Sequence, residues 1–583
     1  DRIAAIYKEA IAKYNQDLDH VVFAVYHAGY GTDNFPAFQS VLAQAGEAKT
    51  VDTPSCSFGC IPSAEETETN KQTKKMEPTT QKAGCFLPHL DAKTWSTLVT
   101  LLESKVATEH ELLELLHKVH VATGHRDPCQ QVKVGKHVQV GQIMQFEGEK
   151  LQDQYKGLVT CLGTMDKARR KGFFSKTLPF MQELALSFPI LFSSGLPLLS
   201  PGTTGSVTLS ARQAACLLSG FFFDLYSKQE HLGQRILLSF RGWLARALKT
   251  HQFKLQCVIR YFEVMRHQQK DSPKKLTKHF FFKNKTPREE KKAFSPKDRA
   301  ITIHRRALTE QEITLCSQDS LLSCEIPLTE FVVDRSREGI ECASGSLQMN
   351  FANKDIGGLV LATGCVQEEI RFSINPECLV AMLLCPTMQA HESITVIGAE
   401  RVASYKGYGG STSYGGDFDD LTPFDSLGRR ATAIVGIDAL QSPLSGLGSF
   451  RRDLVKCLSG FCLSEPGLDA TAYPGVATGN WGCGMFGGDP QTKAVIQWVG
   501  ATLAGRRVVY FPFADKRVNN LELFVTLLAS SNISTVSKLW HLLSSWLKRE
   551  ACYEVESFFD FSQRVLTEVP SGLDQTDLES SPT

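Results

Sequence analysis

Residues 350–372 read NFANKDIGGLVLATGCVQEEIRF, and no other stretch of the sequence says as much about the fold. The glycine pair at 357–358 opens a loop of small residues, and the QEE motif at 367–369 follows it beside an apolar segment. A carboxyl group that is partly desolvated in such a place has a raised pKa, as a general acid requires. The alternative is structural: the glutamates cap or decorate a helix start, and Asn375-Pro376 opens another helix.

Around this stretch, from about residue 300 onward, short apolar runs alternate with helical patterns. The runs ITIHRRAL, SITVIGAE, ATAIVGIDAL and RRVVYFPFA are typical of buried strands, and PQTKAVIQWVGATLAG is typical of a helix. The alternation predicts an α/β layered domain, which we place at residues 298–570.

A second glycine-rich segment, TGNWGCGMFGGDP at 478–490, lies in the same region and holds five glycines within ten residues. Glycines permit unusual φ angles and a close approach of the backbone to a ligand. Asp489 and Pro490 predict the N-cap and first residue of the following helix. A glycine loop that leads into a helix N-terminus suits a diphosphate, although this spacing matches no standard nucleotide motif. A tight turn without a ligand is the alternative.

The YKGY motif at 405–408 precedes a stretch rich in glycine and serine. Its aromatic rings either stack on a base or ribose, or only anchor the loop. N-terminal to the α/β region, residues 85–297 carry mostly helical apolar patterns, near Trp95 and around 103–121, 178–192, 209–226 and 234–263. Residues 271–297 are rich in lysine and arginine, which indicates a solvated loop or, alternatively, a surface that steers a polymer.

Composition limits the class of protein. The 583 residues leave room for several domains, and 42% hydrophobic and 21% charged residues are ordinary for a globular protein. A net charge of +1 gives no global argument for binding nucleic acid or acidic membranes. The 17 cysteines are scattered, and Cys216, Cys257 and Cys457 lie in apolar runs, which predicts reduced, buried thiols. No run of 18 apolar residues predicts a membrane span, and Cys56 and Cys60 lack the further ligands of a zinc site.

Taken together, these motifs resemble the poly(ADP-ribose) glycohydrolase family. Segment 347–372 is similar to the family's FAN…GGG…QEEIRF signature. GYG after ERVASY, ATGNWGCGMFGGD and VVYFPF are similar to further family blocks in the same order, as are NPE and IVGIDAL. LPFMQELALSFPI and TLSARQAACLLSGFFF are similar to the family's accessory helical domain, so the resemblance covers about residues 85–565.

The resemblance implies a macrodomain-like mixed sheet flanked by helices, with an N-terminal, mostly helical accessory domain at 85–297. It also implies an enzyme that hydrolyses the ribose–ribose O-glycosidic bonds of poly(ADP-ribose) without a metal or cofactor. The implied partners are the polymer and the proteins that carry it, with neither membrane nor direct nucleic-acid contact. We expect a monomer that acts in the nucleus or cytoplasm.

The family's residue roles carry over to matching positions. Glu369 is implied to be the general acid and base, because glycoside cleavage needs a proton on the departing oxygen and an activated water. Gln367 and Glu368 would orient the linkage, Asn353 would hold the distal ribose, and Tyr408 would cover the substrate from a mobile loop. Ile340, Glu341 and Phe513 would lie at the adenine, and the glycines Gly357 and Gly358 would approach the ligand. The implied cradle for the diphosphate and ribose consists of Asn480, Trp481, Gly482, Cys483, Gly484, Met485 and Phe486.

The match departs from the family at two positions. Asn350 stands where the family has a catalytic aspartate, so a carboxylate is lost although hydrogen-bonding capacity remains. Leu359 replaces the third glycine of the family's triplet, which would cost about 1–2 kcal/mol if its φ were positive. Both changes favour an alternative hypothesis, a reader that binds ADP-ribose polymer without turning it over. A nucleic-acid protein that uses residues 271–297 is a third hypothesis.

The ends of the chain carry separate predictions. The segment VVFAVYHAGYGTDNFPAFQSVL at 21–42 is similar to the closing strand and helix of microbial-type poly(ADP-ribose) glycohydrolases. Residues 1–45 are therefore predicted to be the end of an upstream macrodomain. Residues 46–84 are polar and aperiodic and predict a flexible linker, and residues 571–583 predict a disordered tail.

Overall fold

The computed structural model describes residues 85–124, 148–226, 238–269, 299–336, 338–441, 446–463, 473–550 and 556–568. All of them belong to one compact unit, Lys82–Thr583. The predicted macrodomain remnant at 1–45, the linker at 46–84, the basic stretch at 271–297 and the tail at 571–583 lie outside the described residues.

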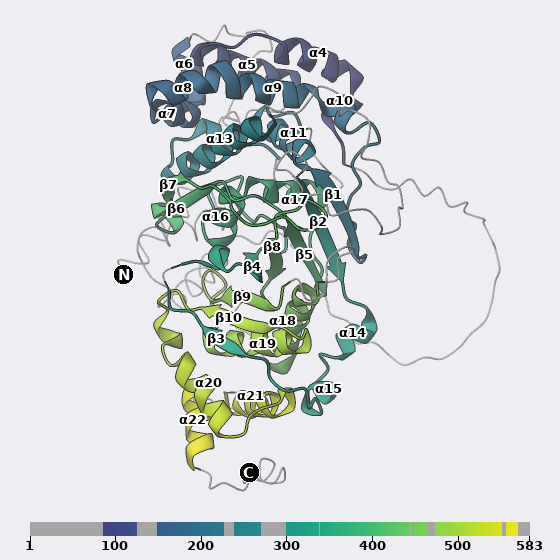
Figure 1. The fold of residues 1–583 in the computed structure, drawn as a ribbon, viewed down its shortest axis with the longest axis vertical. Helices are drawn as coiled ribbons and strands as arrows, with labels where there is room; N and C mark the ends of the chain where they lie inside the picture. The colour runs from purple at the N-terminus through teal and green to yellow at the C-terminus, as the bar shows by residue number, and fades with distance from the viewer. Residues whose placement is uncertain are drawn as a thin grey trace, which may run out of the picture. The chain divides into compact units, whose positions relative to one another are not determined.

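An eight-stranded mixed sheet forms the centre of this unit (Figure 1). Its strands are β1 (Gly205–Ser210), β2 (Ala300–Ala307), β3 (Phe331–Val333), β4 (Ser346–Ala352), β5 (Glu392–Ile397), β8 (Ala433–Asp438), β9 (Gly475–Gly479) and β10 (Arg507–Phe511). They lie in the order β1-β2-β5-β8-β4-β9-β10-β3. The pairs from β1 to β8 are antiparallel, and those from β8 to β3 are parallel. The predicted α/β layered fold is confirmed.

Helices cover both faces of the sheet. One face carries α16 (Gln367–Ile374), η8 (Pro376–Val380) and α17 (Ala381–Leu384), and the other carries α18 (Gly446–Phe461) and α19 (Pro490–Leu503) (Figure 1). Successive side chains of a strand point to opposite faces. Accordingly, Ile434 of β8 packs in the core cluster that includes α16 and α17, whereas its neighbour Val435 packs in the cluster that includes α18 and α19.

The helical region lies above the sheet in Figure 1. Its elements are η2 (Pro88–Leu90), α4 (Ala92–Leu102), α5 (Glu109–Ala122), α6 (Gly148–Gln154), α7 (Lys156–Gly163), α8 (Lys167–Gly172), η4 (Phe173–Thr177), α9 (Leu178–Leu186), α10 (Phe188–Leu191), α11 (Ala211–Phe222), α12 (Arg241–Ala245) and α13 (Lys249–Gln269). Capping boxes begin two of them, with Thr108 and Glu111 at α5 and Ser210 and Gln213 at α11. The helical patterns read from the sequence are therefore confirmed where the structure describes them.

Strand β1 ties the helical region to the sheet. It lies within the part of the sequence read as helical, yet it pairs along its length with β2. The sequence analysis missed it because GSVTLS is short and runs directly into the helical pattern of α11. One core cluster then continues from the helices into the sheet, since residues of α11 and α13 pack together with Ile301 and Ile303 of β2. The domain boundary at residues 297–298 stays a prediction.

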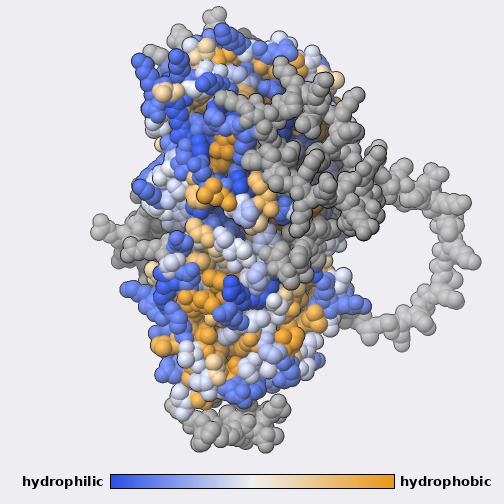
Figure 2. Space-filling model, viewed as in Figure 1, coloured by the Kyte–Doolittle hydropathy of each residue, from blue (hydrophilic) through white to orange (hydrophobic). Residues whose placement is uncertain are grey.

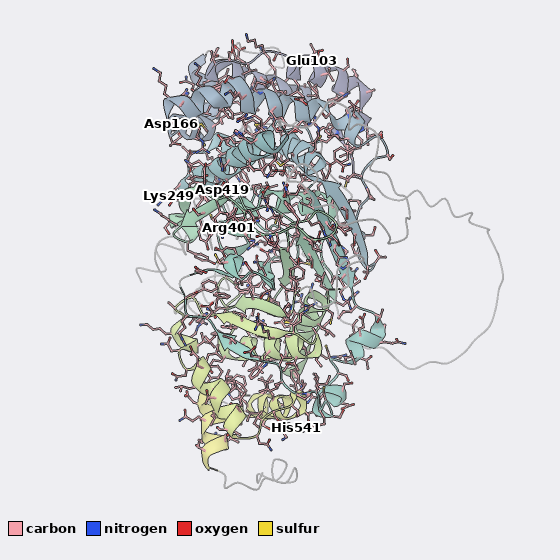
Figure 3. The ribbon with its side chains drawn as sticks, in the orientation of Figure 1. Glu103, Asp166, Lys249, Arg401, Asp419 and His541 are labelled. Carbon is pink, nitrogen blue, oxygen red and sulfur yellow. The ribbon has the colours of Figure 1, made fainter. Side chains whose placement is uncertain are left out.

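The remaining described elements are short connecting pieces, a two-stranded sheet and the C-terminal helices. The chain also forms α14 (Glu310–Thr314), α15 (Gln318–Leu322), η7 (Ile340–Cys342), β6 (Ala403–Lys406), η9 (Gly409–Ser411), β7 (Ser413–Asp417), η10 (Lys516–Val518), α20 (Leu521–Ser530), α21 (Val536–Glu550) and α22 (Phe558–Glu568). The β6–β7 hairpin is fastened to α13 by Arg260, which pairs with Asp417 at 3.0 Å and with Asp419 at 3.1 Å. Figure 3 shows Asp419 beside this junction.

The surface is uneven in polarity. On the face drawn in Figure 2, hydrophilic residues dominate the helical region, and hydrophobic ones gather in the middle and lower parts. Among the described residues, no helix is long and apolar enough to cross a membrane. Cys216, Cys257 and Cys457 are buried and free, as predicted.

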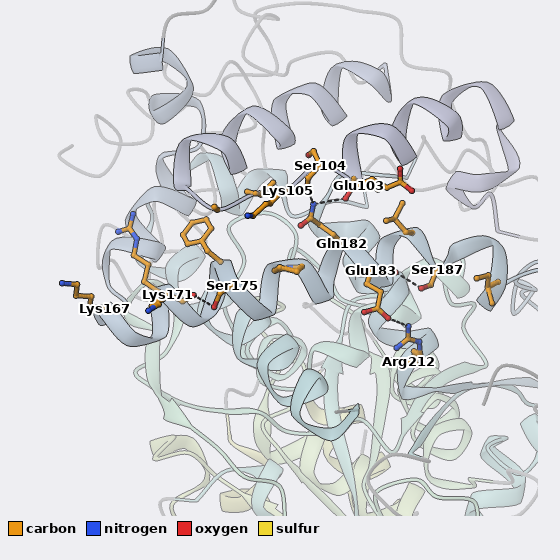
Figure 4. A pocket seen from close by; sticks show the side chains of 18 residues that line it. Glu103, Ser104, Lys105, Lys167, Lys171, Ser175, Gln182, Glu183, Ser187 and Arg212 are labelled. Carbon is orange, nitrogen blue, oxygen red and sulfur yellow. Dashed lines mark hydrogen bonds and ion pairs between the residues drawn. The ribbon is translucent and has the colours of Figure 1, made fainter. Parts of the chain in front are cut away.

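A groove of about 1140 Å³ lies in the helical region (Figure 4). The connection between α4 and α5 forms one wall and α8 and α9 form the other; Gln182 bridges them by donating to the carbonyl oxygens of Leu102 and Ser104 at 2.9 Å each. None of the residues predicted for the functional site lines this groove. The predicted site is therefore built elsewhere in the molecule.

Candidate functional site

The parallel half of the sheet brings the predicted site residues together. Strands β4, β9 and β10 are adjacent and parallel, so the loops that follow them emerge at the same edge. Residues 353–366 follow β4, residues 480–489 follow β9, and residues 512–515 follow β10. In open α/β sheets, ligands bind outside the carboxyl ends of the strands. The QEE segment and the glycine loop, far apart in sequence, therefore share one edge.

Gln367 fixes the start of α16 against β4. Its side-chain oxygen accepts from the backbone N–H of Phe351 at 2.8 Å, and its amide nitrogen donates to the carbonyl oxygen of Met349 at 3.0 Å. The side chain thus continues the hydrogen bonding of β4 where the strand ends. The two glutamates that follow it are consequently held at the mouth of the 353–366 loop.

Glu368 is a buried carboxyl group surrounded by donors. It accepts from Asn350 Nδ2 at 3.0 Å and from the backbone N–H groups of Gly357 at 2.8 Å and Asn353 at 2.9 Å. Burial, and then the charge of Glu369, raises the pKa of Glu368 to about 8, against the effect of these donors. The raised pKa expected for a desolvated carboxyl in this motif is therefore present at Glu368.

Glu369 is held by the loop itself. Its Oε1 accepts from the backbone N–H of Leu359 at 3.1 Å, and its Oε2 accepts from that of Val366 at 2.8 Å. The loop can close this tightly because of two glycines: a Cβ atom would lie 2.8 Å from Glu369 Oε1 at Gly358 and 2.9 Å from it at Gly364. The bond to Val366 also caps the N-terminus of α16. Glu369 is therefore both the helix cap of the structural alternative and a carboxylate held in a fixed position.

The two departures from the family pattern have different surroundings. Asn350 is fully buried, and its Oδ1 has no hydrogen-bond partner among the described residues. Leu359 is 41% exposed. Positive φ angles outside glycine occur, within the described ranges, only at Asp224, Phe513, Ala514 and Asn532. The strain considered for a left-handed Leu359 is therefore absent, because its backbone is not in that region.

The glycine loop at 479–488 is shaped by close contacts. Gly482 has a φ of 75°, and a Cβ atom there would lie 2.6 Å from Cβ of Ala439. Asp489 caps α19 by accepting from the N–H of Thr492 at 2.8 Å, and Pro490 is the first helical residue, as predicted. Within the described part of the chain, the backbone N–H groups of Gly484, Met485 and Phe486 have no acceptor. Unpaired N–H groups that precede a helix N-terminus can bind an anion.

Several side chains of this loop point inward. Trp481 is 1% exposed and donates from Nε1 to the carbonyl oxygen of Ile437 at 3.0 Å. Asn480 accepts from the Tyr510 hydroxyl at 2.8 Å and donates to the Pro512 carbonyl oxygen at 2.9 Å. Cys483 is buried as well. The side chains of Trp481 and Cys483 therefore face the core, and their backbone N–H groups donate to the carbonyl oxygens of Gly479 and Asn480.

Exposed apolar side chains stand around the site. Phe513, at the end of β10, is 52% exposed and adopts a φ of 49°, followed by Ala514 at 59°. Two consecutive non-glycine residues in this region are uncommon, and such backbone outliers concentrate at functional sites. Tyr408 is 53% exposed, and its hydroxyl accepts from the N–H of Gln367 at 3.2 Å. Both rings are therefore exposed, Phe513 just after β10 and Tyr408 beside the start of α16.

The residues expected at the adenine lie beside β9 and β10. Ile340 is buried with Ala477 and Phe511, so only its backbone can face a ligand. Glu341 is partly exposed and hydrogen-bonds to Tyr405, whose pKa is raised mainly by burial. Tyr405 thus anchors the β6–β7 hairpin, and Tyr408 is the more exposed of the two tyrosines.

The sequence analysis missed three residues of the helical region that touch the 353–366 loop. Trp243 Nε1 donates to the Val360 carbonyl oxygen at 2.8 Å, and His251 Nε2 lies 3.2 Å from that of Ala362. Lys254 Nζ donates to both carbonyl oxygens, at 2.8 and 2.9 Å. A signal existed: Lys254 shares the buried stripe of α13 with Val258 and Tyr261, at helical spacing, where a lysine is unusual.

The fold and the site define a class: a macro-domain protein with a helical extension, in which a glutamate pair and a glycine loop meet at the carboxyl edge of the sheet. Comparison with known sequences agrees. A model of the poly(ADP-ribose) glycohydrolase macro domain fold matches residues 318–520, and a model of the helical domain of the same enzymes matches residues 165–279.

Individual relatives point the same way. The chain is 30% identical over 439 residues to the probable poly(ADP-ribose) glycohydrolase 2 of Arabidopsis thaliana, covering 64% of this chain and 77% of the relative. It is 27% identical over 467 residues to poly(ADP-ribose) glycohydrolase 1 of that plant, covering 65% and 79%. With poly(ADP-ribose) glycohydrolase 1 of Caenorhabditis elegans it shares 31% identity over 245 residues, which cover 39% and 30%. The chain belongs to the poly(ADP-ribose) glycohydrolase family.

Proposed function

We propose that the protein hydrolyses the ribose–ribose O-glycosidic bonds of poly(ADP-ribose), releases ADP-ribose and so reverses poly-ADP-ribosylation of proteins. The single observation that carries this proposal is the position of Glu369. Its carboxylate is held by two backbone N–H groups at the same sheet edge as a glycine loop with unpaired N–H groups. Cleavage of a glycosidic bond needs a positioned carboxylic acid, and unpaired N–H groups that precede a helix N-terminus can hold the diphosphate of the substrate.

Glu369 would supply both proton transfers of the reaction. It gives its proton to the departing hydroxyl oxygen as the bond from the anomeric carbon to that oxygen breaks. Water then adds to the oxocarbenium-like carbon and returns a proton to Glu369. General acid–base catalysis by a positioned side chain increases the reaction rate roughly 10²–10⁴-fold. Glu368 and Gln367 would orient the linkage, since both are fixed to β4 and its loop.

The other site residues would bind the ligand. The diphosphate would accept from the unpaired N–H groups of Gly484, Met485 and Phe486. Gly357 and Gly358 would allow close approach, and Asn353 would hold the distal ribose. The adenine would lie near Phe513, the backbone of Ile340 and Glu341. Tyr408 would cover the substrate from its hairpin. The exposed rings of Phe513 and Tyr408 support this arrangement.

The decisive experiment measures ADP-ribose release from purified polymer, alongside calorimetric titration with ADP-ribose. Wild-type protein should release ADP-ribose, and Glu369→Gln should lower kcat by at least about 10²-fold while still binding ADP-ribose. Glu114→Gln, at a partly exposed helix position on α5, is the matched charge control and should behave as wild type. Binding without release in the wild type would instead identify a reader.

We further propose that Asn350 limits turnover. It replaces a catalytic carboxylate of the family and leaves its own Oδ1 unpartnered in the core. Asn350→Asp should raise kcat about tenfold or more, because it returns a proton-exchanging group 3.0 Å from Glu368. An unchanged or lower kcat in a folded Asn350→Asp protein would show that Asn350 is not limiting. Leu359→Gly is the companion variant for the second departure.

The remaining expectations stay proposals: a monomer, acting in the nucleus or cytoplasm on polymer-modified proteins, without direct contact to nucleic acid. Light scattering on the purified protein tests the oligomeric state. Strong, salt-dependent affinity for DNA would contradict the last of these.

A further inference from the structure

Side chains of the helical region donate hydrogen bonds to the loop that holds Glu369. Residues 359–366 form its outer turn, and the carbonyl oxygens of Val360 and Ala362 point toward α12 and α13. Lys254 donates to both, and each also faces a second donor, Trp243 at the first and His251 at the second. Trp243, Lys254 and His251 are each at most 1% exposed.

Lys254 is not needed to satisfy these carbonyl oxygens. Without its ammonium group, Val360 O would still accept from Trp243 Nε1, and Ala362 O from His251 Nε2. Burial, and then the charge of Lys254, lowers the pKa of His251 to about 4, so this histidine is neutral at physiological pH. A neutral imidazole keeps one N–H. On Nε2 it donates to the Ala362 carbonyl oxygen, and Nδ1, which lies 3.3 Å from the Arg246 carbonyl oxygen, then donates to none.

The buried charge of Lys254 also has no carboxylate partner within 4 Å among the described residues. Burying an ammonium group without a partner is costly, and a hydrophobic side chain of similar size would serve stability better. The charged or titratable groups that face it are Glu369 at the start of α16, Cys365 on the loop and His251 on its own helix. Lys254 lies against the Trp243 ring, 5.5 Å from its centroid.

We propose that Lys254 is a positioning residue for the reaction, a fixed positive charge behind the catalytic loop that acts on the glutamate pair through Glu369. It rests on the function proposed above. When Glu369 gives its proton it becomes a carboxylate next to the buried Glu368, and two buried carboxyl groups next to each other disfavour an ionised state. A cation locked behind the loop stabilises that carboxylate as the proton leaves, without occupying the substrate side.

The test compares Lys254→Met with wild type. Methionine keeps the length of the side chain and removes the charge. We expect kcat to fall at least tenfold at pH 7, with little change in affinity for ADP-ribose, while the melting temperature stays equal or rises. A structural lysine would do the opposite, because its loss would lower the melting temperature and leave kcat in the remaining folded protein unchanged. That outcome would overturn the proposal.

Two further readouts separate charge from packing. Burial lowers the pKa of Lys254 to about 8, although Cys365 and Glu369 act to raise it. Lys254 therefore loses its charge as pH rises through about 8, and the ratio of wild-type kcat to Lys254→Met kcat should fall over that range. The matched variant Trp243→Phe removes a donor to the same carbonyl oxygen but no charge. Compared with Lys254→Met, Trp243→Phe should lower the melting temperature more and kcat less, and its kcat relative to wild type should not change with pH. If the two variants behave identically, the charge of Lys254 has no role.

A last measurement does not depend on turnover. Urea unfolding of wild type, Lys254→Met, Glu369→Gln and the double variant gives the coupling between the two positions. We expect Lys254→Met to be more favourable for stability when residue 369 is glutamine than when it is glutamate. Additive effects would overturn the proposal, whereas a wild-type protein that releases no ADP-ribose would refute only the glycohydrolase activity.

Discussion

Glu368 and Glu369 are neighbours in sequence, yet their carboxyl groups have different surroundings. Glu368 is enclosed by three donors from β4 and its loop, whereas Glu369 is bound by the outer part of the loop. Burial keeps the pKa of Glu368 near 8 although donors surround it. The raised pKa therefore belongs to Glu368, whose donors hold β4 and the loop together, whereas the proposed function assigns the proton transfer to Glu369.

This difference predicts how stability depends on pH. The pKa of Glu368 rises from 4.5 in the unfolded chain to about 8 in the folded protein, so the folded state binds an extra proton between these values. The stability from that proton is fully present below pH 4.5 and is lost as pH rises through 8. Between pH 5 and 8, the free energy of unfolding of wild type should therefore fall, relative to Glu368→Gln, by on the order of several kcal/mol. Urea titrations at several pH values measure it, and parallel curves would contradict it.

At the scale of elements, the glycine loop before α19 offers a matched pair of substitutions. Gly482→Ala places a methyl group 2.6 Å from Ala439 and forces alanine to a φ of 75°, so it should destabilise the protein by roughly 1–2 kcal/mol or more and weaken ADP-ribose binding. A Cβ atom at Gly484 would meet only open space, and the φ of Gly484 is not positive. Gly484→Ala should therefore change stability by less than about 1 kcal/mol. Thermal unfolding and titration with ADP-ribose check both variants; equal destabilisation would show that the loop is not held as described.

The same elements show what the sequence could and could not predict. The sequence predicts the strands that are long apolar runs, namely β2, β5, β8 and β10. It also predicts helix α19, because Asp489 and Pro490 form a recognisable helix start. Strand β1 was not readable, because its pairing with β2 is a long-range contact and only Val207 and Leu209 are buried in it. The contacts of Trp243 and Lys254 with the 359–366 loop were missed for the same reason: they join segments that sequence patterns treat one at a time.

For the site, motifs identified positions but not which atoms face a ligand. Trp481 and Ile340 belong to the predicted binding set, yet their side chains are buried, and only packing against Ile437 or Phe511 reveals this. Conversely, nothing in the sequence indicates that Phe513 and Ala514 have positive φ angles. The Phe513 ring lies close to Gly479, a neighbour from another strand that sequence patterns do not pair with it.

At the scale of the whole molecule, the helical region and the sheet share one core. Residues of α11, α13, η8 and β2 belong to a single cluster, and β1 covers the edge of β2. An uncovered strand edge and an uncovered apolar face favour aggregation. Residues 299–568 expressed alone should therefore not form a cooperative fold, although they contain nearly all of the sheet and both site loops.

Unfolding of the full chain tests the same idea. If the core is shared, fluorescence from Trp243 in the helical region and from Trp498 on α19 should report one transition, with the same urea midpoint and slope. Single-tryptophan proteins that retain one or the other residue separate the two signals. Two transitions, or a folded 299–568 fragment with a sharp unfolding curve, would mean that the helical region is a separate folding unit. In that case Lys254 would act across a domain interface, and weakening the interface alone, without touching Lys254, should lower kcat.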